Sequence, residues 1–553
     1  MLTPSIVLFA CIAWTALLFG VALWGERRGH RLSKAWPLIY ALSLAVHCTA
    51  WTYYGAASQG RQWGFPIPPT LAGMALIFAF GLPFLLRLGR LAKQHNSATI
   101  ADLVVARLRA DRGLGFTITL VALFGIIPYI ALQLKAVSQG LGTLLGDGFA
   151  PAGAKLDMSF WFALTMAAFT LLFGARKASA TEPNRGIVVA LGLESVLKLV
   201  ALLAIGLYAA LSVHKAGTPL LEKMAQLPPP AIVPDYLTMV ALGAISAFTL
   251  PHQFHVGVVE LRQTSDLKTA RWMFPVYLLL IGLPSVPMAL AGAAQLPASV
   301  SPDLYVLALP QAAGHHLLAL LAYLGSLSAA TGMMILSGLT LSIMLGNHGF
   351  GSRLLGGIEG GVANADLRPR VLAFRRAGIL AVFLMAWLYS RAMSDTEALS
   401  DFGLMSFTAL SQLAPAVLLA VYRPRTPSPA IIAGIVLGSL AWLWLVLLPM
   451  VIPAATPSVG ADGLHWLSVV SLRVQPGHIA ISMGASLAVN LLTVALVSRA
   501  VRPSLPRRRD AVAAASCAGP PDASLAKSVR ASCWKATPGR CWMTTGSPPS
   551  SAS

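Results

Sequence analysis

Two oppositely charged residues within an apolar stretch are the first candidates for chemistry in this sequence. Glu194 and Lys198 lie in the run GLGLESVLKLVALL, and a spacing of four residues places both on one face of a helix. An ionisable group inside a membrane is costly, so each is a candidate functional residue. Two interpretations stay open: a charge switch that lines an ion or proton path, and a self-neutralised structural pair facing a neighbouring helix.

A second group of titratable residues lies in the stretch PHQFHVGVVELRQTSDLKTAR, which begins at Pro251. His252, His255 and Glu260 cluster toward one end of an apolar segment, and histidine titrates near neutral pH. These three residues could form a proton-sensitive inner gate. Alternatively, they could bond the free carbonyl groups at the end of a helix.

Two apolar segments are interrupted by residues that could bind a solute. In the first segment, the run ALSLAV gives way to HCTAWTYYG. The second contains Pro251, which removes one backbone donor and frees a carbonyl. Packing within a core is the alternative explanation for the histidine and the aromatic residues. The candidate solute ligands are His47, Thr49, Trp51, Tyr53, Ser246 and Thr249.

The elements that must position these residues are membrane-spanning helices. The chain has 553 residues, of which 56% are hydrophobic and 11% charged. A spanning helix needs about 20 apolar residues, because hydrocarbon offers its backbone no other hydrogen-bond partner. We therefore predict an all-α membrane protein with about 13 transmembrane helices. They centre near residues 14, 46, 77, 128, 167, 199, 247, 282, 330, 381, 410, 438 and 489.

Basic residues gather in alternate connections between these segments. Basic connections are retained in the cytoplasm, so the N-terminus is predicted outside and the C-terminus inside. The net charge of +20 is thus a topology signal, and a nucleic-acid partner is not expected. The basic groups lie at residues 27–34, 87–112, 176–185, 262–271, 353–376, 423–425 and 499–509.

Ten consecutive segments divide into two groups of five, residues 37–212 and 238–423, each beginning with one of the interrupted segments. Because five is odd, the second group must be inverted relative to the first, as in many secondary transporters. A short amphipathic helix in SATIADLVVARL, capped by Ser97, is predicted on the cytoplasmic face. We find no phosphate loop, metal cluster or nucleophile–base arrangement, so neither an enzyme nor a metal cofactor is predicted.

Four stretches carry a family resemblance: YALSLAVHCTAWTYYG, IIPYIALQLKAVSQG, ALGLESVLKLVALL and LPHQFHVGVVELRQTSDLKTARWMFPVYLLLIGLP. Over residues 1–505 the chain resembles the sodium/solute symporter family. It is most similar to the membrane part of symporter-linked, histidine-sensing sensor histidine kinases. The resemblance implies a leucine-transporter-like core, a five-plus-five inverted repeat with the solute held between the broken first and sixth core helices.

Two departures from the family affect the coupling ion. The eighth core helix of family transporters offers hydroxyl groups to sodium, but here Gly332 and Met333 stand at those positions. Ser328 and Thr331 are nearby substitutes, and His47 replaces an aspartate. Sodium prefers hard oxygen ligands. Of the two candidate coupling ions, H+ and Na+, the sequence therefore favours protons, with Glu194, Lys198, Ser328 and Thr331 as the ion or proton path.

The expected function is secondary transport of a small solute, an amino acid such as histidine, by a multi-pass protein of the bacterial inner membrane. The alternative is a solute-sensing input module of a two-component sensor, whose partner would be a histidine kinase or response regulator. The kinase domains of the resembled proteins are missing from this chain. We divide the chain into a transmembrane domain, residues 1–505, and a basic, then disordered cytoplasmic tail, residues 506–553, which reads like out-of-frame translation.

The charge alternation predicts a topology that reporter fusions can check. A reporter fused after Thr3 should be active only outside the cell, and one fused after Arg509 only in the cytoplasm, because basic connections stay on the cytoplasmic side. A reporter within residues 215–235 should behave like the first. Cytoplasmic activity at that position would contradict the topology and the inverted repeat together.

Overall fold

A computed structural model describes residues 3–64, 67–108, 112–145, 158–174, 184–215, 234–349, 368–392, 399–448 and 479–501. The chain divides into two units, Met1–Val501 and Arg502–Ser553. All described residues belong to the first unit, so the predicted tail, residues 506–553, lies outside them. Within the described ranges, every regular element is a helix. The protein is therefore all-α, as predicted.

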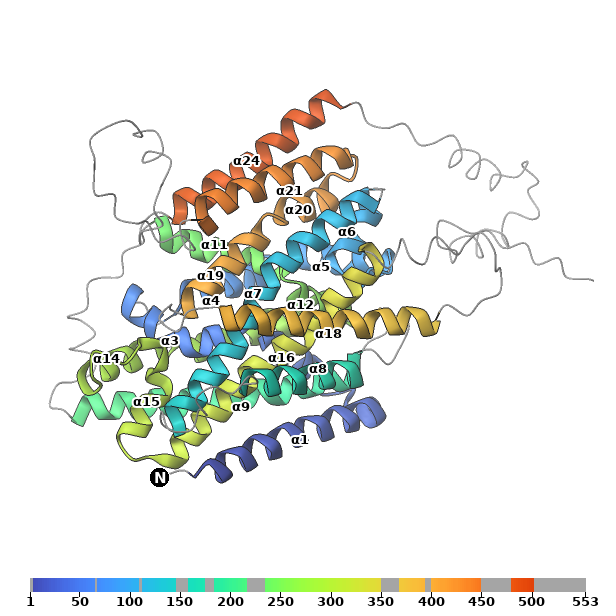
Figure 1. Cartoon of the computed structure of the whole chain (residues 1–553). Coiled ribbons are helices and arrows are strands. Elements are labelled where there is room, and N and C mark those ends of the chain that lie inside the picture. Colours follow the sequence, from blue (N-terminus) through green and yellow to red (C-terminus); the bar gives the residue numbers. More distant parts are fainter. Residues whose placement is uncertain are drawn as a thin grey trace, which may run out of the picture. The chain divides into compact units, whose positions relative to one another are not determined.

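Figure 1 shows the helices coloured in chain order. Their bounds are α1 (Pro4–Arg28), α2 (Trp36–Ser43), α3 (Ala50–Trp63), α4 (Pro69–Phe80), α5 (Leu82–Gln94), α6 (Ile100–Leu108), α7 (Arg112–Leu145), α8 (Met158–Gly174), α9 (Arg185–Lys215), α11 (Pro234–Thr249), α12 (Pro251–Phe254), α13 (Thr264–Gly282), α14 (Ser285–Gln295), α15 (Tyr305–Ala312), α16 (His316–His348), α18 (Arg368–Ala392), α19 (Leu399–Ser411), α20 (Ala414–Tyr422), α21 (Ser428–Trp442) and α24 (Ile479–Ala500). The 3-10 helix Leu44–His47 follows α2, and the π-helices His255–Val259 and Leu443–Leu447 follow α12 and α21.

Many of these helices are long and apolar enough to cross a membrane. The described residues contain nine such helices by length and composition, or up to 11 if each of two bent pairs is one span. Trp36–His47 and Met158–Phe173 are shorter apolar helices. All of the predicted segment centres fall within described helices. The helical, multi-pass character is thus confirmed, whereas the count of thirteen spans, the repeat and the orientation stay predictions.

Both predicted interruptions are breaks in the structure. The first separates α2 from α3 at the non-helical Cys48 and Thr49. The second separates α11 from α12 at Leu250, where the axis bends by 57°. Leu250 is extended (φ −72°, ψ 120°), because the ring of a following proline disfavours helical geometry. A third break, of 79° between α4 and α5, was not predicted.

The connections predicted to share one membrane side contact one another. Lys93 donates to the carbonyl of Arg262 over 2.7 Å, and Arg107 to that of Ala420 over 3.1 Å. On the side predicted to be external, Asp303 accepts bonds from Ser58 and from the backbone of Leu399. The alternation of the connections is therefore consistent with the helix packing. Which side faces the cytoplasm stays a prediction.

The predicted linker helix exists as α6, but its cap is not Ser97. The Thr99 hydroxyl accepts a bond from the Asp102 backbone, and the Asp102 carboxylate accepts one from the Thr99 backbone, which makes a capping box. Asp102 also bonds His348 (2.7 Å) and Asn347 (3.1 Å) at the end of α16. Burial by itself raises the pKa of Asp102, but its bond to His348 and the charge of that residue, with the bonds of Asn347 and Thr99, lower it overall.

Helices α4 and α11 approach each other closely through two glycines. A Cβ at Gly73 would lie 1.8 Å from the carbonyl oxygen of Val240, and one at Gly243 would lie 2.0 Å from that of Thr70. Small residues allow such close backbone packing, which membrane helices use in place of the hydrophobic effect. This contact joins α4 to α11, which leads into the second break.

Alanine at either glycine should destabilise the protein. The added Cβ must push two backbones apart, which costs about 1–3 kcal/mol or more for an overpacked core. We expect Gly73→Ala and Gly243→Ala to lower the thermal midpoint of the detergent-solubilised protein. Gly484→Ala is the matched control, because a Cβ there meets nothing within 4 Å. Equal midpoints for all three variants would contradict the packing.

Candidate functional site

The first break exposes several backbone carbonyls that need donors inside the bundle. Ser195 of α9 donates to the carbonyl of Leu42 over 2.7 Å. Gln253 of α12 reaches the carbonyl of Leu44 over 3.4 Å. A buried carbonyl without a donor is costly, most of all at membrane depth. The break is therefore held by side chains from two other helices.

Lys198 supplies the strongest of these bonds. Its ammonium donates to the carbonyls of Ala45 (2.5 Å) and Cys48 (2.8 Å), on the two sides of His47. The side chain is 2% exposed. Hydrogen bonds from a charged donor are shorter and stronger than neutral ones. A basic side chain of the protein thus occupies the carbonyls of the first break.

Glu194, one turn earlier on α9, bonds a different helix. Its carboxylate accepts the hydroxyl of Thr331 over 2.5 Å, and its backbone carbonyl accepts the hydroxyl of Ser328 over 3.0 Å. A Cβ at Gly332 would lie 2.5 Å from the Glu194 carboxylate. The glycine therefore makes room for the glutamate. The structure brings the predicted path residues together, with Glu194 and Lys198 bonded to different partners.

An aromatic cluster surrounds the second half of the first break. The Phe407 ring of α19 lies 4.8 Å from that of Trp51, 5.8 Å from that of Tyr129 and 6.0 Å from that of His47, between centroids. The Thr49 hydroxyl bonds the Tyr129 hydroxyl over 2.8 Å. The amide oxygen of Gln133, on α7, accepts a hydrogen bond over 2.9 Å from the backbone N–H of Ala50, the first residue of α3.

His252 lies beside this cluster, and its place in an inner gate stays a prediction. Its ring lies 6.2 Å from that of Tyr129, and its Nδ1 lies 3.1 Å from the Ser337 hydroxyl of α16. Within the described residues, Nδ1 of His47 and Nε2 of His252 are buried without a hydrogen-bond partner. Such atoms can bond a solute that enters between the two breaks.

The other predicted solute ligands face other partners. Ser246 and Thr249 donate to carbonyls of their own helix, those of Gly243 (2.7 Å) and Ile245 (3.1 Å). Tyr53 donates to the carbonyl of Ala322 on α16 over 3.0 Å. In this conformation, their hydroxyls stabilise helices. Their role as solute ligands stays a prediction.

The remaining two gate residues do come together. His255 Nε2 lies 3.5 Å from the carboxylate of Glu260. Both oxygens of that carboxylate accept the backbone N–H of Asn184, over 3.0 and 3.1 Å, at the start of α9. Negative charge is favourable at a helix N-terminus. Nearby, Tyr40 donates to the carbonyl of Gly257 over 2.7 Å and so joins α2 to the π-helix.

Sequence reasoning missed Tyr129, Gln133, Ser337 and Phe407. Three of them lie on the long helices α7 and α16, within largely apolar runs. Tyr129 and Gln133 had the clearest signal, since Tyr129 follows a proline inside a helix and Gln133 lies one turn later. Phe407 offered no signal, because an aromatic residue in an apolar segment is ordinary.

Comparisons with known proteins agree with this architecture. The fold is that of a helical membrane transporter: the chain superposes on a Na+-coupled sialic acid symporter in its substrate-bound, outward-open state, with a TM-score of 0.62. That match has 12% identity and covers 90% of this chain and 98% of the symporter. A mutant manganese transporter of Eremococcus coleocola gives a TM-score of 0.47 at 14% identity, covering 83% and 94%. At that score, the likeness does not establish a shared fold.

Among curated proteins, the chain resembles one from Bacillus subtilis (strain 168) that bears the name uncharacterized symporter YodF. The two are 22% identical over 296 residues, which are 49% of this chain and 56% of that protein. The match thus spans about half the length of this curated relative. No protein-family profile matches the chain.

The bonds of Lys198 predict how a substitution there will act. Lys198→Met should lower the free energy of unfolding by roughly 2–4 kcal/mol, because the buried carbonyls of Ala45 and Cys48 lose their donor. Thermal midpoints of the solubilised protein measure the effect. Lys34→Met is the control, since Lys34 is exposed and its loss should be neutral. An unchanged midpoint for Lys198→Met would show that these bonds contribute no net stability.

Proposed function

We propose that this protein is a proton-coupled secondary transporter that moves a small solute by alternating access. The observation that carries the proposal is the ammonium of Lys198 on the Ala45 and Cys48 carbonyls of the first break. Backbone carbonyls freed in a broken helix are ligands for coupling cations in transporters. Here a titratable cation of the chain takes that place, so coupling follows its protonation.

The proton path that we propose runs through Glu194 and Lys198. In its protonated form, Lys198 holds the break against α9. A neutral amine bonds carbonyls more weakly, so proton loss frees the break to move. Glu194, which accepts the Thr331 hydroxyl, links the same face of α9 to α16. In each cycle one proton enters from outside, travels with the solute and leaves to the cytoplasm.

Sodium would find the Ala45 and Cys48 carbonyls of the first break already bonded by Lys198. Ser328 and Thr331 donate their hydroxyl protons to Glu194, which directs these side chains toward α9. Gly332 has no side chain, and a serine there would collide with the Glu194 carboxylate. Placing serine at this position would therefore disturb Glu194 before it could bind sodium. The carbonyls that Lys198 occupies support coupling to protons over sodium.

The proposed solute site is the cluster of His47, Trp51, Tyr129, His252 and Phe407 between the two breaks. Aromatic faces attract ring systems and cations, and the two unpartnered imidazole nitrogens offer hydrogen bonds. An amino acid such as histidine has a ring, a cation and hydrogen-bonding groups, and the family resemblance indicates the same class. The curated relative and the structural match above a TM-score of 0.5 are both named as symporters, which favours transport over solute sensing.

Uptake into proteoliposomes tests the coupling. Accumulation of radiolabelled histidine should persist when potassium replaces sodium, fall to background with a protonophore, and weaken as external pH rises, because external protons load the carrier. Glu194→Gln should abolish accumulation but retain exchange of labelled for unlabelled solute, since exchange needs no net proton movement.

Lys34→Met is the control for this experiment and should accumulate solute normally. Strict dependence on sodium, with indifference to the protonophore at a fixed sodium gradient, would contradict proton coupling. A series of other radiolabelled amino acids, each added in the same assay, tests the solute class separately from the coupling ion.

A further inference from the structure

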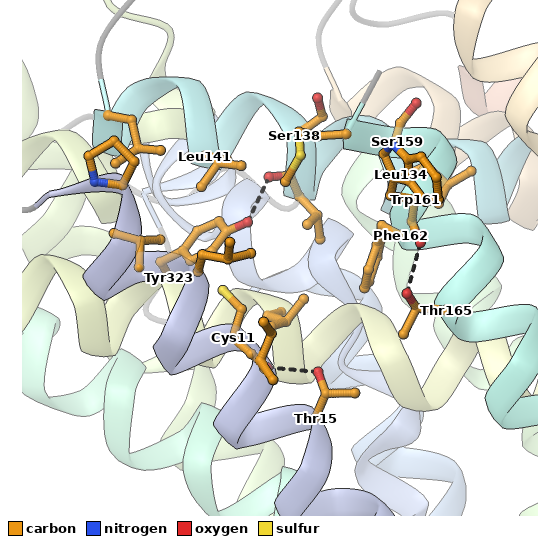
Figure 2. A pocket seen from close by; sticks show the side chains of 18 of the residues that line it. Cys11, Thr15, Leu134, Ser138, Leu141, Ser159, Trp161, Phe162, Thr165 and Tyr323 are labelled. Carbon is orange, nitrogen blue, oxygen red and sulfur yellow. Dashed lines mark hydrogen bonds between the residues drawn. The ribbon is translucent and has the colours of Figure 1, made fainter. Parts of the chain in front are cut away.

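A cavity separates part of α1 from the core helices. Its volume is about 510 Å³, and it lies between α1, α7, α8 and α16. Figure 2 shows Cys11 and Thr15 of α1 on one side and Leu141, Phe162 and Tyr323 across from them. This volume is within the usual range of ligand sites, about 300–1,000 Å³. It lies outside the proposed solute site.

The packing of α1 explains why the space exists. The later half of α1 packs tightly on α9: a Cβ at Gly186 would lie 2.2 Å from the carbonyl oxygen of Ala22, and one at Gly25 would lie 3.1 Å from the Val189 Cβ. In the first half of α1, only Val7 is buried among the described residues up to Leu17. α1 is thus fixed at one end and leaves a gap along the other.

The lining suits hydrocarbon. Among the described residues that line the cavity, none is acidic, basic or a histidine. Thr15 donates to the carbonyl of Cys11 (2.8 Å), Thr165 to that of Trp161 (2.8 Å) and Tyr323 to that of Val137 (3.3 Å). These hydroxyls are already bonded to backbone, so they make no demand on an occupant. The hydroxyls of Ser138 and Ser159 also line the cavity, but a polar solute would still lose most of its own hydrogen bonds there.

We propose that one acyl chain of a membrane lipid occupies this cavity. The cavity is continuous with the surface that faces the bilayer, because Leu8, Ile12 and Trp161 line it and are 54%, 59% and 54% exposed. A flexible hydrocarbon chain fits a cavity of about 510 Å³ whose lining is mostly apolar and which opens on the bilayer-facing surface.

The acyl chain contacts α16, the helix whose Ser328 and Thr331 bond Glu194 of the proposed proton path. Tyr323 and Leu327 line the cavity from α16, and Ser328 and Thr331 follow on the same helix. The acyl chain therefore fills the space between α1 and α16 and supports the packing of α16. The proposal concerns lipid binding and stands independently of the coupling ion and the solute.

Photolabelling in proteoliposomes tests the proposal. The probe is a phosphatidylcholine with a diazirine on one acyl chain, and mass spectrometry locates the labelled residues. Tyr323 and Leu327 are 2% and 4% exposed, so an acyl chain must lie inside the cavity to label them. We expect label on both residues and on Leu388, which is 53% exposed on α18 and reports ordinary contact with bulk lipid.

Cys11→Phe and Thr15→Phe should fill the cavity and remove most label from Tyr323 and Leu327, while Leu388 keeps its label. Ala13→Phe is the matched control, because Ala13 is exposed and does not line the cavity; it should leave all labels unchanged. Label on Leu388 without label on Tyr323 and Leu327 in the unmodified protein would overturn the proposal. Labels that persist in both filled variants would overturn it as well.

Discussion

The interruption of a helix at membrane depth frees carbonyl groups that must find donors within the protein, and the centre of this molecule is arranged around that requirement. Ser195, Lys198 and Gln253 provide those donors for the first break. Hydrocarbon provides none. Because the donors come from α9 and α12, the break is stable only while these helices pack against it, and a change in any donor alters the helix that it holds.

Helix α9 is the platform that links the other parts. Through Lys198 it holds the first break, and through Glu194 it bonds Ser328 and Thr331 of α16. At the start of α9, the backbone N–H of Asn184 donates to the carboxylate of Glu260, which follows the second break. Each broken helix is thus tied to α9 by a charged side chain. Movement of either break must alter one of these bonds, which is the physical basis for the proposed coupling.

Close helix contacts limit which positions can carry side chains. Gly73 and Gly243 let two backbones touch, and Gly332 leaves room for a buried carboxylate. Gly403 lies so close to Trp51 that a Cβ would be 2.5 Å from its ring, and this places the indole against α19. Membrane helices gain their stability from such packing and from interhelical hydrogen bonds. The aromatic cluster therefore depends on small residues as much as on its rings.

The sequence by itself determined the helical membrane class and the two breaks, because apolar run length, charge alternation and a proline inside a span are local properties. It also singled out Glu194, Lys198, Thr331 and His47 by their chemistry. Only the tertiary structure decided that Lys198 bonds the break while Glu194 bonds α16, that His252 lies with Tyr129 and that Thr99 caps α6. Partners of this kind are set by which helix faces meet, and one side chain's type does not encode the neighbour across the interface.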